Sequence, residues 1–273
     1  MVLPETGTRT RDPFRLRERI AGTDADAFVL VTPRRWRPYR SVPAPAIDGR
    51  AVALVRADVP ADLPVPGPPA AAEAPWVVSA MAKDVFLGPA GRWADTLTRA
   101  GCSVADLRAD RARREDLVAA LRSGPSVVLY AGHGRPRGWG GYQGVRWNHV
   151  DPASAGRGRP AGLVVAFACD TLKGSRSGVP FGNRVVEGGV AGAYLGAARA
   201  LQTAEAEDLA DIVVGLLATG TGPTAAHLVA AVDHEVRGNP GAARAWRQFR
   251  LVGDPFVSLE RTVGERHGAQ AHG

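Results

Sequence analysis

The sequence is poor in cysteine and in lysine. Its only cysteines are Cys102 and Cys169, and its only lysines are Lys83 and Lys173, in a chain of 273 residues. A small secreted domain stapled by disulfides needs more cysteines than this, so we expect free thiols in a reducing compartment. A disulfide framework is therefore excluded, and each thiol is available for chemistry.

Long apolar segments are also missing. No stretch approaches the ~18 consecutive apolar residues that suggest a membrane span. The longest, residues 209–218, is short and is interrupted by Asp211. Residues 1–20 carry charges of both signs and have no apolar segment like that of a signal peptide. These features predict a cytoplasmic protein with no membrane partner.

The formal net charge of +7 would, taken alone, suggest an acidic partner such as nucleic acid. The charge comes almost entirely from arginines scattered along the chain, and Ala, Gly and Pro are also abundant, a composition typical of codon bias. Aromatic residues do not interleave with the basic ones as they do in single-strand binders. The composition therefore argues against nucleic-acid binding through the Arg-rich segment 134–161. Such binding would weaken steeply as the salt concentration rises.

The Pro- and Ala-rich segment 59–75 can continue neither a helix nor a strand and predicts a linker. We expect strands at 27–32 and 50–57 before it. The predicted organisation has three parts: an N-terminal extension or small subdomain at 1–72, the main domain at 73–260, and a disordered tail at 261–273.

From Trp76 onward, apolar runs alternate with amphipathic segments. This β–α alternation predicts an α/β fold with a mostly parallel sheet flanked by helices. Loops are predicted at 81–90 and 134–161. The predicted strands lie at 76–80, 102–107, 126–134, 162–170, 188–195 and 249–256, and the predicted helices at 91–100, 113–122, 181–187, 204–219 and 222–237.

Two of these strands are nearly continuous apolar runs that end in residues able to do chemistry. The run at 126–134 ends at His133, and the run at 162–170 ends at Cys169. Because carboxyl ends of parallel strands meet at one edge of a sheet, the two side chains are expected close together, as a nucleophile and its base. Gly134 follows the histidine, and its N–H together with that of Cys169 is suited to hold an oxyanion.

The two cysteines also have a structural interpretation that involves no catalysis. A free cysteine after a buried strand is more often a small core residue than a nucleophile, and Cys102 is most simply core. The pairing of His133 with Cys169 favours catalysis because a neighbouring imidazole can activate a thiol that is otherwise mostly protonated near neutral pH.

The motifs Tyr130-Ala-Gly-His-Gly134 and Phe167-Ala-Cys-Asp170 occur in the order histidine first, cysteine one strand later. This order resembles the caspase-like cysteine peptidases of clan CD, and within them the gingipain-type peptidases and the CHAT domains. The similarity extends over about residues 75–258. It includes two helices at 91–121, a small-residue strand at 185–196, and the ending Leu251-Val-Gly-Asp-Pro255.

The resemblance implies a caspase-like three-layer sandwich in which His133 is the general base or proton shuttle and Cys169 forms an acyl-enzyme. It implies a protein or peptide substrate and no cofactor or metal. Asp84 is where this clan often lines its specificity pocket, which would suit Arg or Lys before the scissile bond. Asp170 either contacts substrate or caps the following turn. Trp139 either contacts substrate or is a packed anchor of its loop.

Two functional classes follow from this pattern. The first is a cysteine endopeptidase, regulated by a protein partner or by self-cleavage in the 134–161 loop. The alternative is a catalytically silent module that uses the same fold as a scaffold or signalling adaptor. The intact histidine–cysteine pair favours the enzyme.

Overall fold

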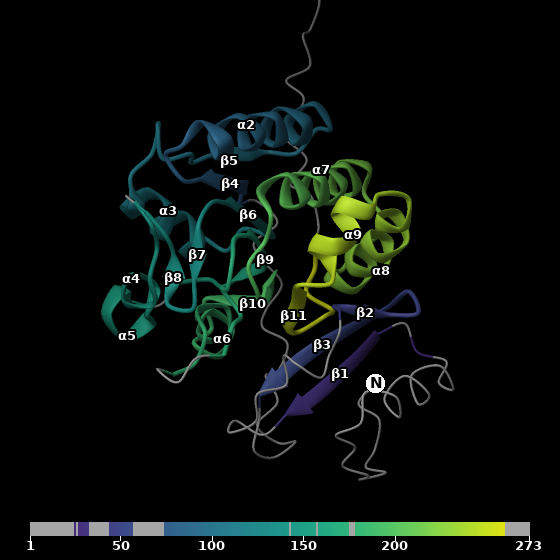
Figure 1. Ribbon diagram of the computed structural model, residues 1–273. Helices are drawn as coiled ribbons and strands as arrows, with labels where there is room; N and C mark the ends of the chain where they lie inside the picture. The colour runs from purple at the N-terminus through teal and green to yellow at the C-terminus, as the bar shows by residue number, and fades with distance from the viewer. Residues whose placement is uncertain are drawn as a thin grey trace, which may run out of the picture.

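The structure is a computed structural model, and it describes residues 25, 27–32, 44–56, 74–141, 143–156, 158–174 and 178–259. Its centre is a nine-stranded sheet with the order β1-β3-β11-β10-β9-β6-β4-β5, and β2 pairs with β3 at one side (Figure 1). The strands of the sheet are β1 (Ala27–Thr32), β2 (Ala46–Ile47), β3 (Arg50–Arg56), β4 (Trp76–Ala80), β5 (Val104–Asp106), β6 (Val127–Ala131), β9 (Ala161–Phe167), β10 (Ala191–Ala197) and β11 (Phe249–Gly253).

The sheet is mostly parallel. The antiparallel pairs are β10 with β11 and β2 with β3. The other neighbours run parallel, as β–α alternation predicts, since a helix between two strands returns the chain to the same edge of the sheet. The predicted fold class is therefore confirmed.

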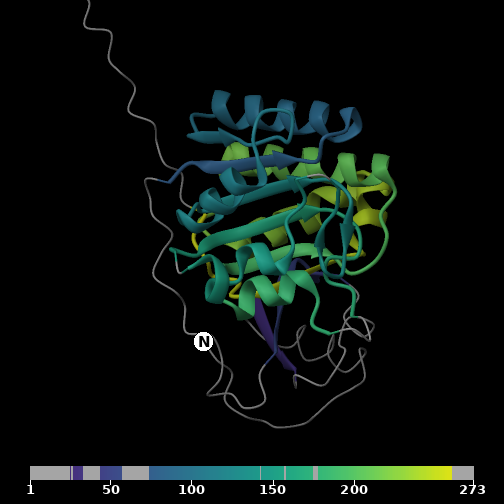
Figure 2. The same cartoon turned by 90° about the vertical axis from the view of Figure 1, so that its left-hand side faces the viewer.

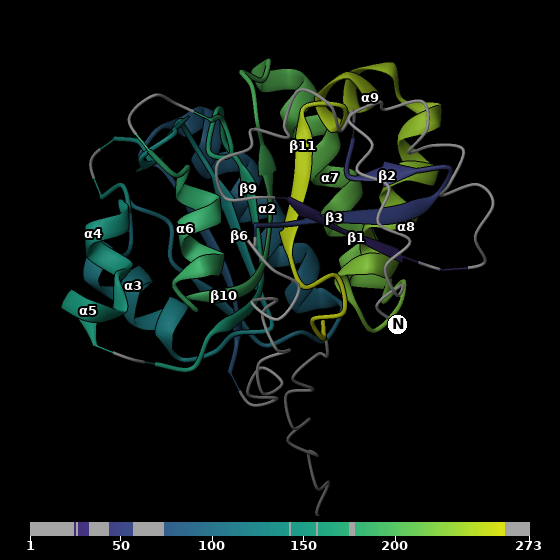
Figure 3. The same ribbon diagram turned by 90° about the horizontal axis from the view of Figure 1, so that it is seen from below.

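Helices cover both faces of the sheet, so the molecule has three layers (Figure 3). One face packs against α2 (Asp84–Arg99), α7 (Thr203–Thr219), α8 (Ala225–Glu235) and α9 (Pro240–Trp246), with the 3-10 helix η3 (Val236–Gly238) before α9. The other face packs against α3 (Arg114–Arg122), α4 (Trp147–Val150) and α6 (Phe181–Glu187). The short helix α5 (Pro152–Ala155) follows α4 in the chain. Figures 1 and 2 show α2 and α7 lying side by side.

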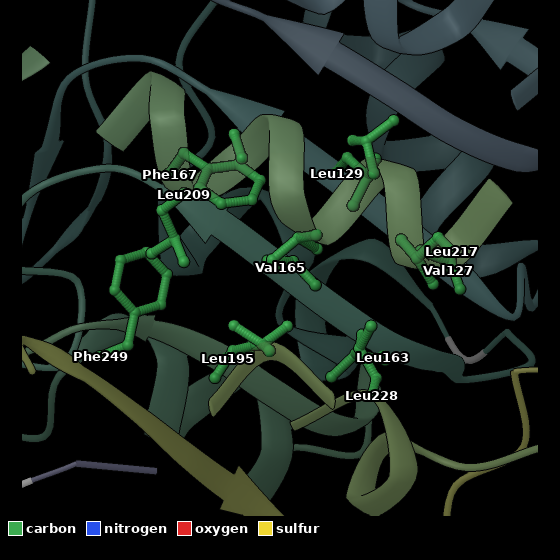
Figure 4. Packing of buried hydrophobic residues seen from close by; sticks show 14 of the residues in the cluster. Val127, Leu129, Leu163, Val165, Phe167, Leu195, Leu209, Leu217, Leu228 and Phe249 are labelled. Carbon is green, nitrogen blue, oxygen red and sulfur yellow. The ribbon is translucent and has the colours of Figure 1, made fainter. Parts of the chain in front are cut away.

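The central strands are apolar on both faces because they are buried on both faces. In β9, Leu163, Val165 and Phe167 point toward α7, whereas Val164 and Ala166 point toward α6. Figure 4 shows the first group with Leu209 and Leu217 of α7. Burial of each such Leu, Val or Phe side chain contributes roughly 1.5–3 kcal/mol, so this alternation fixes the register of β9.

The strands predicted in the N-terminal extension belong to the same sheet. β3 pairs in parallel with β11, where Leu251 is opposite Ala53 and Val252 is opposite Leu54, and β1 pairs with β3. Residues 59–73 of the predicted linker at 59–75, and the predicted tail at 261–273, lie outside the described residues. The three-part division of the chain therefore stays a prediction.

Several predicted boundaries are wrong. Helix α2 begins at Asp84, not at residue 91, although Gly88 and Pro89 weaken a helix. Its Pro89, Ala90, Trp93, Ala94 and Leu97 are buried, and this burial outweighs the local cost. The strand predicted at 188–195 is β10, shifted to Ala191–Ala197, because α6 and its turn extend to Val190.

The segment 134–161 is not a plain loop. It contains a hairpin of β7 (Gly134–Arg135) and β8 (Gly138–Trp139), followed by α4 and α5. Helix α9 was also not predicted. The cap at its start is visible in the sequence, where Asn239 precedes Pro240 and its side-chain oxygen accepts the Ala242 N–H at 3.0 Å.

Candidate active site

His133 and Cys169 follow adjacent parallel strands at equivalent positions. Ala131 of β6 pairs with Phe167 of β9, and each chemical residue comes two positions after its member of this pair. Adjacent strands lie about 4.7–4.9 Å apart, and residues two apart share a face. Ala131 and Phe167 both point toward the α2 and α7 layer. The sheet therefore brings His133 and Cys169 together at its carboxyl edge, beside these two helices.

Cys169 is held mainly by backbone groups. The Leu201 N–H donates a hydrogen bond to its Sγ at 3.3 Å, and the Asp170 N–H donates to the Arg199 carbonyl at 3.2 Å. Asp170 has a φ of 60°, in the left-handed region that Asp tolerates better than most residues. The turn after β9 is thus tied to the loop after β10, and the half-buried thiol points toward that loop.

His133 is exposed, and two side chains of the α2 segment hold its ring. Phe86 packs edge-on against the imidazole with ring centroids 5.2 Å apart, and the Lys83 Nζ lies 3.3 Å from Nε2. An ammonium group donates hydrogen bonds and cannot accept them, so in the neutral ring Nε2 is the acceptor and the proton is on Nδ1. Lys83 thereby selects a tautomer of His133.

The backbone under His133 is fixed by the hairpin that follows it. Its carbonyl accepts the Gly140 N–H at 2.7 Å and the Tyr130 hydroxyl at 3.4 Å. Burial raises the pKa of Tyr130, so this phenol stays protonated and able to donate. The Tyr130 ring stacks on Trp139 at 4.2 Å, which anchors the hairpin to the sheet.

Gly134 packs directly against the backbone of the cysteine turn. A Cβ at this position would overlap the Cys169 carbonyl oxygen and would lie 2.9 Å from both the Ala168 Cβ and the Thr171 Cγ2. Only glycine permits this approach. The two chemical residues are therefore linked through the close packing of Gly134 on Cys169 as well as through the sheet.

A pocket of about 210 Å³ opens beside His133 and Cys169. Helix α2 and the start of α7 form its walls, and the ends of β6 and β9 form its floor. Its described lining consists of Val85, Phe86, Pro89, Trp93, Ala131, Gly132, His133, Phe167, Ala168, Cys169, Leu201, Thr203, Ala206 and Glu207.

The three predicted substrate-binding residues do not line this pocket. Asp84 was expected on a loop, but it is the exposed first residue of α2. Asp170 forms an ion pair with Lys173 at 3.1 Å within its own turn. Trp139 is 3% exposed and its indole N–H donates to the Tyr194 hydroxyl, so its position is that of a packed anchor.

Sequence reasoning missed most of the residues around the site, among them Lys83, Phe86, Leu201 and Glu207. Lys83 and Phe86 were assigned to a loop, although a helix starting at Asp84 brings both toward the end of β6. Leu201 and Glu207 lie more than thirty residues after Cys169, in the loop and helix that follow β10. A signal was available for that loop, because the segment after a strand next to β9 lies at the same sheet edge.

Helix α2 is also supported from behind. Asp106 binds Arg108 through two hydrogen bonds, at 2.8 and 2.7 Å, and Arg108 donates to the Leu87 carbonyl at 3.0 Å. The side-chain hydrogen bond from Arg108 lowers the pKa of Asp106 and outweighs the opposing effect of burial. Gly91 of α2 leaves room for the Arg108 guanidinium.

Within the described residues, no group of three or more His, Cys, Asp or Glu side chains could hold a metal ion. In the same part of the chain, none of the helices has the length and apolar character needed to cross a membrane.

Comparison with known proteins identifies the family. Residues 75–260 match the family model described as Peptidase family C25. The chain belongs to peptidase family C25. The predicted enzyme class, a cysteine-type peptidase and therefore a hydrolase, is thus confirmed. No curated protein sequence matches the chain.

Solved structures agree with the fold of this C25 peptidase. The Arg-specific cysteine proteinase gingipain R (RgpB) is 14% identical with a TM-score of 0.66, over 90% of this chain and 67% of that chain. A complex of the Porphyromonas gingivalis RgpB pro- and mature domains is 15% identical with a TM-score of 0.67, over 92% and 70%. The Saccharomyces cerevisiae separase–securin complex is 13% identical with a TM-score of 0.52, over 78% and 14%. The predicted caspase-like, gingipain-like fold is confirmed.

Proposed function

We propose that this C25 peptidase is an endopeptidase that cuts peptide bonds with Cys169 as nucleophile and His133 as proton shuttle. One observation carries the proposal: the two side chains follow adjacent strands at equivalent positions and line one pocket. The alternative of a silent scaffold has no comparable observation in its favour.

The reaction takes two steps. In the first, the Cys169 sulfur attacks the scissile carbonyl carbon, the C–N bond breaks, and the leaving amine takes the thiol proton through His133. In the second, water attacks the thioester carbonyl, its proton passes through His133 to the departing sulfur, and the carboxylic acid is released. The proton count is restored at the end of each cycle.

The oxyanion that develops in each step needs donors beside Cys169. The N–H groups of Gly134 and Cys169 are the proposed pair, and the close packing of Gly134 on the Cys169 backbone supports this assignment. Removal of one such donor typically costs about 10²–10³ in rate. Asp170 and Trp139 contribute to the fold of the site, and neither is needed in this mechanism.

The test is covalent labelling by peptidyl probes that carry a thiol-reactive electrophile. Wild type is compared with Cys169→Ala, His133→Ala and Cys102→Ala, the last being a matched control because Cys102 is buried away from the pocket. We expect labelling to survive the loss of Cys102, to vanish without Cys169, and to slow at least a hundredfold without His133. Labelling that persists in Cys169→Ala would refute the proposal.

We further propose that a protein partner or self-cleavage controls the activity. The titles of two structural neighbours, the RgpB pro- and mature-domain complex and the separase–securin complex, each name an assembly with a second chain or domain. The β7–β8 hairpin is exposed at residues 135 and 137, so another molecule of the peptidase can reach this segment, and its cleavage requires no preference for the arginines themselves. Purified wild type should then yield fragments ending in 134–161, and Cys169→Ala should stay intact. The cytoplasmic location stays a prediction.

A further inference from the structure

The pocket beside Cys169 is walled mainly by apolar side chains. Helix α2 contributes Val85, Phe86, Pro89 and Trp93, and the floor contributes Phe167. Leu201 and Ala206 complete the wall on the α7 side. A charged group placed among these side chains would lose water without gaining hydrogen bonds. The walls therefore favour an uncharged apolar occupant.

Among the described residues that line the pocket, Glu207 is the only carboxylate. It is already bound to a cation, because its Oε1 accepts a hydrogen bond at 2.5 Å from Arg92 of α2. The next residue of α2 makes a second link one turn further along α7, since the Trp93 indole N–H donates to Asp211 at 2.9 Å. Arg92 and Trp93 thus join α2 to α7 at the pocket wall. The Arg92–Glu207 pair is solvent-exposed, with side chains 58% and 36% exposed, and Arg92 is the cation that partners the Glu207 carboxylate.

The pocket has the size of a single side chain. Its volume of about 210 Å³ is below the roughly 300–1,000 Å³ of sites for whole drug-sized ligands. In an acyl-enzyme, the residue before the scissile bond is attached to Sγ through its own carbonyl carbon. Its side chain is therefore the part of the substrate nearest to this pocket.

We propose that the pocket selects a large uncharged apolar residue, such as Leu, Met or Phe, before the scissile bond, and that Arg92 is the residue that excludes Arg and Lys. This inference rests on the proposed function. A basic side chain would have to displace Arg92 from Glu207, and an acidic one would meet Glu207 itself. This proposed apolar preference replaces the preference for Arg or Lys that Asp84 would have given, because Asp84 does not line the pocket.

The experiment measures labelling rates with probes that differ only in the residue next to the electrophile: Leu, Met, Phe, Ala, Asp, Arg or Lys. We expect the Leu, Met and Phe probes to react at least tenfold faster than the Arg, Lys and Asp probes. Cys169-dependent labelling that is fastest with Arg or Lys would overturn the inference while leaving the proposed function intact. No Cys169-dependent labelling by any probe would overturn both.

Substitution of Arg92 tests its role directly. Arg92→Ala frees the Glu207 carboxylate, so the rate of the Arg and Lys probes relative to the Leu probe should rise about tenfold. Adding Glu207→Gln should cancel that rise. Arg99→Ala is the matched control, because Arg99 is an exposed arginine of the same helix that does not line the pocket. An unchanged Arg-to-Leu ratio in folded Arg92→Ala would refute the role of Arg92.

Substitution of Ala206 changes the size of the pocket and leaves its charged residues unchanged. Ala206→Phe fills the space between α7 and α2, so the Leu and Phe probes should slow at least tenfold relative to the Ala probe. Thermal unfolding of each variant checks that it is folded. An equal slowing of all probes would show that this pocket does not receive the side chain before the scissile bond.

Discussion

The ends of β6 and β9 are equivalent in register but present their side chains in different ways. Cys169 is half-buried and is held by backbone groups of two turns, above all the Leu201 N–H. His133 is exposed, and its ring is held by the side chains of Lys83 and Phe86. Cys169, the proposed nucleophile, is thus fixed by the main-chain fold, whereas the ring of His133, the proposed proton shuttle, can adjust when substrate arrives. The comparison leads to separate predictions for the backbone that holds Cys169 and for the side chains that hold His133.

The largest effect is expected from Gly134→Ala, which disturbs the backbone that holds Cys169. The new methyl group overlaps the Cys169 carbonyl oxygen, and such overpacking typically costs about 1–3 kcal/mol of stability. Displacement of the proposed oxyanion donors should slow Cys169 labelling at least a hundredfold. Labelling kinetics and urea unfolding measure the two effects.

Gly215→Ala in α7 is the control for this substitution, because a Cβ there meets nothing within 4 Å. It should leave labelling unchanged and should stabilise the helix by about 1 kcal/mol. Normal labelling of Gly134→Ala would show that the close approach of the two turns is not needed for activity.

The second effect concerns the side chains that hold His133. Phe86→Leu keeps the pocket wall apolar but removes the edge-to-face ring contact, which is worth about 0.5–1.5 kcal/mol. The labelling rate with a probe carrying Ala should fall about threefold to tenfold while the unfolding midpoint changes little. Phe256→Leu, at a residue 50% exposed, should have no effect. A large loss of stability without loss of rate would contradict this assignment.

The third effect tests the support behind α2. Asp106→Asn breaks the pair with Arg108, and both side chains are at most about a quarter exposed. Loss of charge-assisted hydrogen bonds should cost about 1–2 kcal/mol at pH 7, and the shift of α2 should slow labelling about twofold to threefold. Asp110→Asn, in the same loop with a side chain 42% exposed, should be nearly neutral.

The pH dependence of this pair follows from the lowered pKa of Asp106. A depressed carboxyl pKa contributes stability that is fully present above the unfolded value of about 3.9 and is lost as pH falls through the folded value. The stability difference between wild type and Asp106→Asn should therefore shrink below about pH 4. Unfolding by urea from pH 7 to pH 3 measures it, and a constant difference over this range would contradict the ionic origin.

The smallest effect is expected from Lys83→Met, which removes the donor to the His133 Nε2. The contact is exposed, so solvent replaces most of it, and labelling should slow only about twofold. Lys83→Arg retains a donor and should restore the rate. A loss as large as that of His133→Ala would mean that Lys83 takes part in the reaction itself.

Much of the fold, and the placement of His133 and Cys169 at one edge of the sheet, could be predicted from the sequence. The apolar runs before His133 and Cys169 are unambiguous because strands buried on both faces show no alternation. The start of α2 could not be predicted, since Gly88 and Pro89 argue locally against a helix that tertiary burial stabilises. That error placed Asp84 on a loop, whereas it is the exposed first residue of α2; its substrate-binding role stays a prediction.

The pairing of Arg92 with Glu207 also could not be predicted. It joins residues 115 positions apart in the chain and depends on how two helices pack against one another. The role of Trp139 could not be decided from the sequence, because an aromatic residue in a glycine-rich segment can be either a ligand contact or a packed anchor. In the structure, Trp139 stacks on Tyr130 of β6, a contact that depends on the tertiary fold, and this contact favours the anchor.

The position of β11 has a consequence for the order in which the chain assembles. This strand, made from residues 249–253, separates β3 from β10 and is the neighbour through which β1 and β3 join the sheet. During synthesis the N-terminal strands emerge first, but their neighbour emerges about two hundred residues later. Until then β3 exposes a strand edge that could pair with another chain. Truncation before Phe249 should therefore yield a protein that aggregates through its N-terminal strands.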